Sequence, residues 1–250
     1  MEIAFHKIFN PKKFVIVSFY TIGNLYEREK DFFIYSMNLL QINYIIYKIN
    51  NNIKFDDNKE LNTIKKWNYI TYIKPKILLE IIEKFNYEKI VWCDIDSMFF
   101  NYPKKLNLIK EDYGFYFGYT KNNKKKFLSG VLYFRNNSKT KDILNLWIEK
   151  LDNIKIKDIN FGNYMELSDQ KILGEIIEMQ NEQYYNLGEK YFGIYNKILS
   201  NKEKYTDYYI VHFQASRRNT HKFVNKERHM NEEKKIKIFR DNLFKVNIYK

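Results

Sequence analysis

Two aspartates, Asp94 and Asp96, stand one residue apart directly after the apolar run 89–93. The run has the length and apolar composition of a buried strand. Residues two apart on an extended chain point to the same side, so both carboxylates would lie on one face. In an open α/β sheet, ligands bind beyond the carboxyl ends of the strands, where these acids fall. Two such oxygen donors suit Mg²⁺ or Mn²⁺, and the cation in turn suits a diphosphate.

An Asp-x-Asp pair is also common as two solvated turn acids or a helix cap, and three enzyme chemistries use it. Haloacid-dehalogenase-like phosphatases place the pair after their first strand and follow it with Thr or Val, where this chain has Met98. Polymerase-β-like nucleotidyltransferases need a Gly-Ser turn and helix just upstream, and the stretch 76–85 contains no Gly-Ser. Glycosyltransferases of the A fold carry the pair after an α/β nucleotide-binding half. The position of the pair in this chain favours the third chemistry.

The elements that must position these acids alternate between strand and helix. Apolar and β-branched runs predict strands at 14–20, 44–49 and 89–93, and helical apolar spacing predicts helices at 27–41 and 76–85, the second opened by Pro75. This order is typical of a right-handed α/β unit with parallel strands. Further strands are predicted at 114–119, 127–134 and 208–213, and helices at 139–151 and, with Ser168 as N-cap, up to residue 179.

From about residue 14 to 218, the ordered motifs resemble the glycosyltransferase A fold. Within that fold they are similar to the glycogenin and bacterial galactosyltransferase family of nucleotide-diphospho-sugar transferases. The resemblance implies one α/β domain with a mixed, mainly parallel central sheet flanked by helices. The run 15–21 is similar to the family's first strand, whose end contacts uracil and ribose. This likeness implies donor contacts by Ser18, Tyr20 and Thr21.

The basic segment 74–76, ahead of a helix, is similar to the family's basic segment near the donor phosphates and sugar, and we expect Lys76 to fill that role. Asp94 and Asp96 match the family's metal-binding pair. The resemblance implies that Asp96 ligates the metal directly and that Asp94 also reaches the ribose.

The segment 127–134 is similar to the family's Phe-Asn-Ser/Ala-Gly-Val segment, which lines the sugar site, and this implies donor contacts by Ser129 and Gly130. The family's Asn is Leu128 in this chain. Asp169 and Gln170 match the Asp-Gln pair beside the anomeric carbon, which implies a catalytic role for both.

The segment 212–218 falls on the family's His-x-x-Gly-x-x-Lys pattern, in which the His is the third metal ligand and the Lys holds the diphosphate. His212 takes the first position, Ala215 replaces the glycine, and Arg218 stands in for the lysine. Arginine keeps a charged phosphate donor in place. Taken singly, each match has a plainer reading, such as a core histidine for His212 or a helix N-terminus for Asp169. The inference rests on their order and spacing together.

The resemblance implies a metal-dependent transferase that moves a sugar from a nucleotide diphosphate, with UDP favoured, to an acceptor hydroxyl on a glycan or glycolipid. Mn²⁺ or Mg²⁺ held by Asp94, Asp96 and His212 would neutralise the departing diphosphate, assisted by Arg218. Asp169 is either the base of an inverting enzyme or the stabiliser of the oxocarbenium face in a retaining one. The motif matches favour retention.

The composition leaves two rival functions open. The chain has 43 Lys and Arg against 30 Asp and Glu, a net charge of +13, and its aromatic content is 18%. Such a surplus favours anionic partners, although a bias towards AT-rich codons also accounts for it. A nucleic-acid-binding module is the main alternative, but most aromatics have core spacing and no recognised motif appears, so we expect no nucleic acid partner. A phosphatase with Asp94 as nucleophile is the second alternative function.

We expect a transferase domain at 1–230 and a basic amphipathic helix at 231–250, with Ile236 and Phe239 among its apolar residues. This helix would pack on the domain or contact a membrane surface. The single cysteine, Cys93, excludes a disulfide scaffold, and neither a targeting signal nor a spanning segment is visible. A cytoplasmic protein is the expectation, with peripheral membrane contact as its variant.

Overall fold

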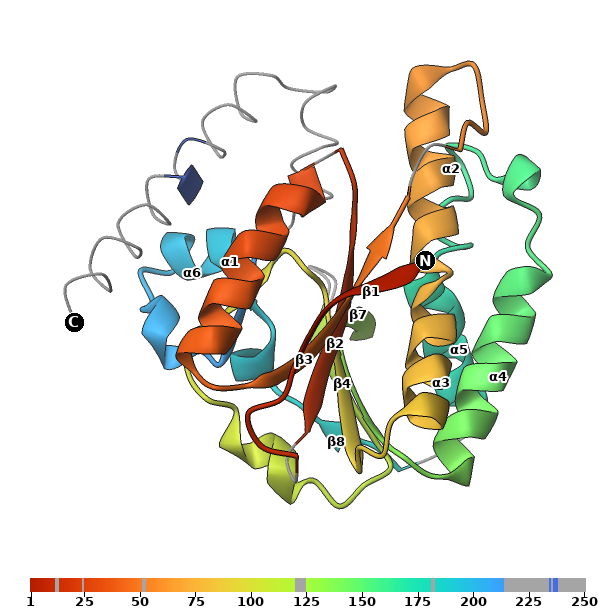
Figure 1. The fold of residues 1–250 in the computed structure, drawn as a ribbon. Helices are drawn as coiled ribbons and strands as arrows, with labels where there is room; N and C mark the ends of the chain where they lie inside the picture. Colours follow the sequence, from red (N-terminus) through yellow and green to blue (C-terminus); the bar gives the residue numbers. More distant parts are fainter. Residues whose placement is uncertain are drawn as a thin grey trace.

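The chain builds a large mixed sheet with helices on both faces (Figure 1). A second, smaller sheet has three strands. The structure is a computed structural model, and it describes residues 1–11, 14–23, 25–50, 53–119, 125–180, 183–213, 234 and 236–237. The described elements, in chain order, are β1 (Glu2–Lys7), β2 (Val15–Thr21), α1 (Leu25–Leu39), β3 (Asn43–Ile49), α2 (Lys59–Thr71), α3 (Lys74–Lys84), β4 (Lys89–Cys93), β5 (Ser97–Phe99), η1 (Lys104–Leu108), β6 (Tyr113–Tyr119), β7 (Lys125–Arg135), α4 (Ser138–Asp152), η2 (Ile156–Asp158), α5 (Asp169–Gln180), β8 (Tyr185–Asn186), η3 (Glu189–Tyr191), β9 (Gly193–Ile194), α6 (Tyr195–Ser200), η4 (Tyr205–Asp207) and β10 (Ile210–His212).

The strand order of the large sheet is β1-β3-β2-β4-β7-β6-β8. β2 runs parallel to both β3 and β4, as the strand–helix order of the sequence predicts. β1 and β7 run antiparallel to their neighbours, and β8 is parallel to β6. The sheet is therefore mixed, with its central parallel strands ending at the same edge. The small sheet has the order β5-β10-β9.

Alternate residues of the central strands face opposite layers of the molecule. Val17 and Trp92 pack in one apolar cluster with residues of α3, α4 and α5. Ile16 and Val91, one position earlier on their strands, pack in another cluster with residues of α1. Figure 1 shows α1 across the sheet from α3, α4 and α5. This α/β/α layering results from the period-two side-chain pattern of buried strands.

The predicted elements between residues 14 and 213 agree with the structure to within two residues at each end. The prediction omitted β1, α2, α6 and the short strands β5, β8 and β9. β1 is an edge strand whose side chains are mostly exposed, so no apolar run marks it. In α2, a polar helix, the Asn58 side chain caps the first turn by accepting hydrogen bonds from the backbone N–H groups of Glu60 and Leu61.

Most of the predicted C-terminal helix lies outside the described residues, as does Arg218. The described residues of that segment are Lys234, Ile236 and Lys237. Ile236 is buried and belongs to an apolar cluster with Val211 of the small sheet. None of the helices in the described part of the chain is both long and apolar enough to span a membrane.

Candidate donor and metal site

The two aspartates lie in the turn between the large and small sheets. β4 ends at Cys93 and β5 begins at Ser97, so the chain leaves one sheet and enters the other within the Asp-x-Asp turn. The backbone N–H of Asp94 donates to the carbonyl of Gly130 on β7 (N···O 2.9 Å), and that of Phe213 donates to the carbonyl of Asp96 (2.8 Å). These bonds attach the turn to both sheets.

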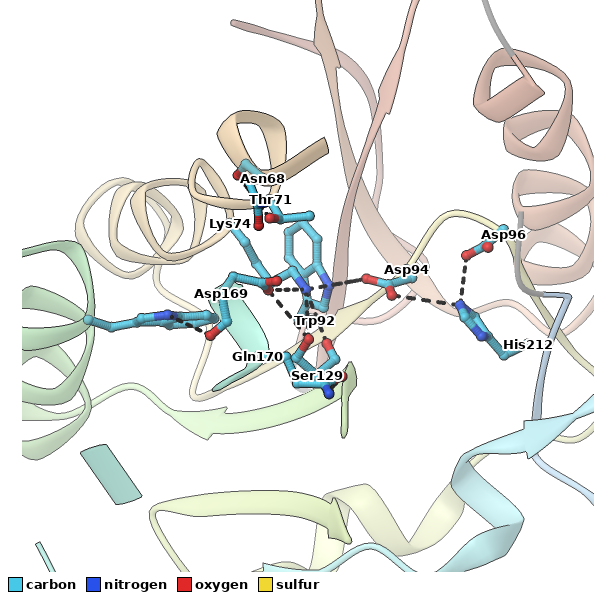
Figure 2. A network of polar contacts seen from close by, with 11 residues as sticks. Asn68, Thr71, Lys74, Trp92, Asp94, Asp96, Ser129, Asp169, Gln170 and His212 are labelled. Atoms are coloured by element: carbon cyan, nitrogen blue, oxygen red, sulfur yellow. Dashed lines mark hydrogen bonds and ion pairs between the residues drawn. The ribbon is translucent and has the colours of Figure 1, made fainter. Parts of the chain in front are cut away.

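The small sheet brings His212 to this turn, because β10 runs antiparallel to β5 and pairs His212 with Ser97. His212 Nε2 lies 2.8 Å from Asp96 Oδ1 and 3.7 Å from Asp94 Oδ2 (Figure 2). One ligand atom from each of these three residues lies within 4.8 Å of the other two. Two carboxylates and an imidazole at this separation could bind a divalent metal ion.

A buried ammonium stands on the other side of Asp94. Lys74 Nζ lies 2.9 Å from Asp169 Oδ2 and 3.5 Å from Asp94 Oδ1 (Figure 2). It also donates to the carbonyl oxygen and the hydroxyl of Ser129, at 3.2 and 3.3 Å. The Trp92 ring centroid is 5.2 Å from the same nitrogen. Because an ammonium has three N–H donors, these contacts are enough to use all of them.

Electrostatics keep Lys74 charged in this buried place. Burial opposes the ammonium form, but the carboxylates of Asp169 and Asp94 outweigh it and raise the pKa of Lys74. Burial also raises the pKa of Asp94, against the opposing charges of Lys74 and His212. Lys74 is the first residue of α3, where the helix dipole disfavours a cation. The ion pairs must therefore supply the stabilisation that holds it there.

Asp169 and Gln170 begin α5 and face the same network. Asp169 is only 2% exposed, and its Oδ2 accepts from the Ser129 hydroxyl at 3.4 Å as well as from Lys74. The Ser129 backbone N–H donates to Gln170 Oε1 at 3.3 Å. The Trp147 indole N–H donates to the Asp169 carbonyl at 3.1 Å. The structure thus brings the predicted residues 129, 169 and 170 together.

Gly130 is packed tightly between residues of this site. A Cβ built on Gly130 would lie 2.4 Å from Phe192 Cε2 and 3.2 Å from Asp94 Oδ2. The Phe192 ring in turn packs on the His212 ring, with centroids 5.3 Å apart. Only glycine leaves room for both neighbours.

The structure does not place Lys76 in the site, contrary to the prediction. Lys76 Nζ lies 2.7 Å from Asp152 Oδ1 in an ion pair whose side chains are 44% and 55% exposed. Residues two apart on a helix point to different sides, so Lys74 and Lys76 cannot share one environment. Among the described residues, the lysine that contacts Asp94 and Asp169 is Lys74.

The predicted nucleoside contacts lie along β2. Val17 pairs with Trp92, and because β2 and β4 are parallel, Tyr20 and Thr21 come at the same sheet edge as the aspartate turn. Ser18, Tyr20 and Thr21 are all buried. Their contact with a donor stays a prediction.

Sequence reasoning included Lys74 in the basic segment 74–76 but assigned its role to Lys76, and it missed Trp92. The signal for Trp92 was present, because it precedes Asp94 by two residues on an extended chain and must share its face. The signal for Lys74 was weaker, since the exact start of α3 decides whether position 74 or 76 faces the sheet.

Comparison with known families and structures identifies the chain. Residues 34–230 match the family described as nucleotide-diphospho-sugar transferase. The chain belongs to this family. No curated protein sequence matches the chain.

Three solved glycosyltransferases share the fold of this chain. One is involved in glycosylation of the major capsid of PBCV-1 (TM-score 0.54, 15% identity, 81% of this chain and 93% of that one). Another is apo-form GlyE from Streptococcus pneumoniae TIGR4 (TM-score 0.51, 16% identity, 82% and 55%). The third is bifunctional WbbM (TM-score 0.52, 13% identity, 85% and 47%). The enzyme spans about half the length of the last two. Family and fold together make it a glycosyltransferase.

Removing the buried ammonium should destabilise the enzyme strongly. Lys74→Ala leaves the Asp169 carboxylate buried without its partner, and we expect the free energy of unfolding to fall by about 3–5 kcal/mol. Lys76→Ala breaks an exposed pair and should change it by less than about 1 kcal/mol. Urea unfolding monitored by circular dichroism measures both. Equal effects would contradict the assignment of Lys74 as the buried partner.

Filling the space at Gly130 should disturb the packing beside His212. We expect Gly130→Ala to lower the free energy of unfolding by about 1–3 kcal/mol, because the new methyl group overlaps the buried Phe192 ring. Gly162→Ala, in an exposed turn where the Cβ meets a single side-chain oxygen at 3.2 Å, is the matched control. Thermal unfolding of both variants is the measurement, and a Gly130→Ala variant as stable as the control contradicts the prediction.

Proposed function

We propose that the enzyme transfers a sugar from a nucleoside diphosphate, with UDP favoured, to an acceptor hydroxyl, and that it uses a divalent cation. The observation that carries this proposal is the cluster of Asp94, Asp96 and His212 at the carboxyl end of β4 in a nucleotide-diphospho-sugar transferase. The resemblance to the glycogenin family favours UDP among the nucleotides.

The three ligands fit Mn²⁺ better than a purely oxygen-seeking cation, because imidazole joins the two carboxylates. Mg²⁺ is the alternative. A cation bound there would supply Lewis-acid stabilisation of the diphosphate leaving group. Asp94 and Asp96 supply the negative charge for it, and His212 is held towards them by the pairing of β10 with β5.

The residues around Lys74 would form the sugar side of the proposed site. Asp169 would stabilise the positive charge of an oxocarbenium-like transition state, and Gln170 with Ser129 and Gly130 would line the sugar. A general base must reach the acceptor hydroxyl. Asp169 is buried and already engaged by Lys74 and Ser129, which supports electrostatic stabilisation and a retaining reaction.

Other parts of the proposal rest on the sequence alone. Ser18, Tyr20 and Thr21 would contact the nucleoside, and Arg218 would hold the diphosphate. The acceptor would be a glycan or glycolipid. The segment 231–250 would pack on the transferase domain 1–230 or bring a cytoplasmic enzyme to a membrane surface.

Metal and donor binding can be tested by thermal unfolding with UDP-, GDP-, CDP- and TDP-sugars, each with Mn²⁺ and with chelator. A ligand at a hundred times its dissociation constant adds about 2.7 kcal/mol of stability. We expect one nucleotide class to raise the melting temperature by several degrees with Mn²⁺ but not with chelator.

The matched variants for this test are Asp96→Asn and Asp152→Asn. Asp96→Asn should abolish the Mn²⁺-dependent shift, because it removes a proposed ligand charge. Asp152→Asn changes an exposed carboxylate on α4 and should leave the shift intact. The absence of a shift with any nucleotide in the unsubstituted enzyme would contradict the proposed function. Salt-sensitive, metal-independent binding of oligonucleotides would instead favour the nucleic-acid alternative.

Retention can be tested once a donor is known. The buried, engaged state of Asp169 leads us to expect a product whose anomeric configuration is that of the donor. Proton NMR of the reaction, recorded before the product equilibrates, gives the configuration from the anomeric coupling constant. A product of inverted configuration would show that the acceptor is deprotonated by a base and that Asp169 has been assigned the wrong role.

A further inference from the structure

An indole N–H in the core is aimed at one of the candidate metal ligands. Trp92, on β4, is 1% exposed, and its Nε1 donates to Asp94 Oδ1 at 2.8 Å (Figure 2). Since Trp92 and Asp94 are two residues apart on an extended chain, their side chains leave the same face of the sheet. We infer that Trp92 is a positioning residue, which orients the Asp94 carboxylate for a divalent cation.

The two oxygens of Asp94 have different surroundings. Oδ1 accepts from the Trp92 indole and lies 3.5 Å from Lys74 Nζ. Oδ2 lies 3.7 Å from His212 Nε2, on the side of the metal cluster. One oxygen is thereby directed into the protein, and the other is left for the cation.

The Trp92 side chain itself is held in place by close packing. Its ring lies 5.4 Å from that of Phe19, centroid to centroid, and 5.2 Å from the ammonium of Lys74. The side chain of Asp94 is 32% exposed at the end of a strand, and the rigid indole restricts its rotation together with the Lys74 ammonium, which lies 3.5 Å from the same oxygen. Groups that hydrogen-bond to metal ligands from outside are typically needed for affinity. This inference rests on the proposed metal-dependent function.

The substitution Trp92→Phe isolates the indole N–H, because phenylalanine keeps an aromatic face beneath Lys74. We expect the dissociation constant for Mn²⁺ alone to rise at least about tenfold, the usual size of such an effect. Free Mn²⁺ measured by electron paramagnetic resonance gives this constant without any activity assay.

Trp147→Phe is the matched control. Trp147 is 0% exposed, and its indole N–H donates to the backbone carbonyl of Asp169, not to the metal cluster. The Trp147→Phe variant should bind Mn²⁺ with the same dissociation constant as the unsubstituted enzyme. Unchanged affinity in Trp92→Phe, or an equal loss in both variants, would overturn the inference and leave the proposed function standing. An unsubstituted enzyme that binds no Mn²⁺ would overturn both.

A second measurement uses the unsubstituted chain, in case Trp92→Phe does not fold. The enzyme has three tryptophans, so ¹⁵N-tryptophan labelling gives three indole N–H signals. Trp67→Phe and Trp147→Phe assign two of them, and the Trp92 signal follows by elimination. We expect saturating Mg²⁺ to shift the Trp92 signal and to leave that of Trp67, on α2, unmoved. A Trp92 signal that does not respond would overturn the inference.

Discussion

The ammonium of Lys74 is the buried charge on which the arrangement of the site depends. Taking a charge out of water is costly, and it is tolerated only where opposite charges and hydrogen bonds surround it. Here the compensation comes from a strand end, a second strand and a helix start, through Asp94, Ser129 and Asp169. The polar contacts of Lys74 therefore also hold together α3, β7, α5 and the end of β4, which are far apart in the sequence.

Asp94 connects the polar contacts around Lys74 to the candidate metal cluster. Through one oxygen it belongs to the network around Lys74 and Trp92, and through the other it faces His212. The side that would hold a sugar and the side that would hold a cation thus share one carboxylate. If the proposed roles hold, this sharing would set the leaving group and the developing positive charge of the sugar at a defined separation, which is a form of preorganisation.

The parts of this enzyme that can be predicted from sequence are those with a strong local signal. The central strands have long apolar runs, and the third of these runs leads directly into Asp94 and Asp96. The expectation that these two side chains lie on one face of an extended strand was wrong in its reason, because they come together in the turn between β4 and β5. His212 could be assigned only from the order of the motifs. Its position beside the aspartates depends on β5, a strand of three residues that is too short to show an alternating apolar pattern. Lys74 could not be told from Lys76, since the distinction depends on where α3 begins. β1 was missed because an exposed edge strand has no apolar run.

The division into two sheets has a consequence for biosynthesis. The large sheet is complete at Asn186 of β8, whereas the small sheet still needs β9 and β10, which ends at His212. Ribosomes deliver the chain from its N-terminus at about 5–20 residues per second. A nascent chain can therefore assemble its principal sheet, with both aspartates in place, before the histidine has emerged. The candidate metal cluster of Asp94, Asp96 and His212 is therefore complete only after the residues of the large sheet have been synthesised.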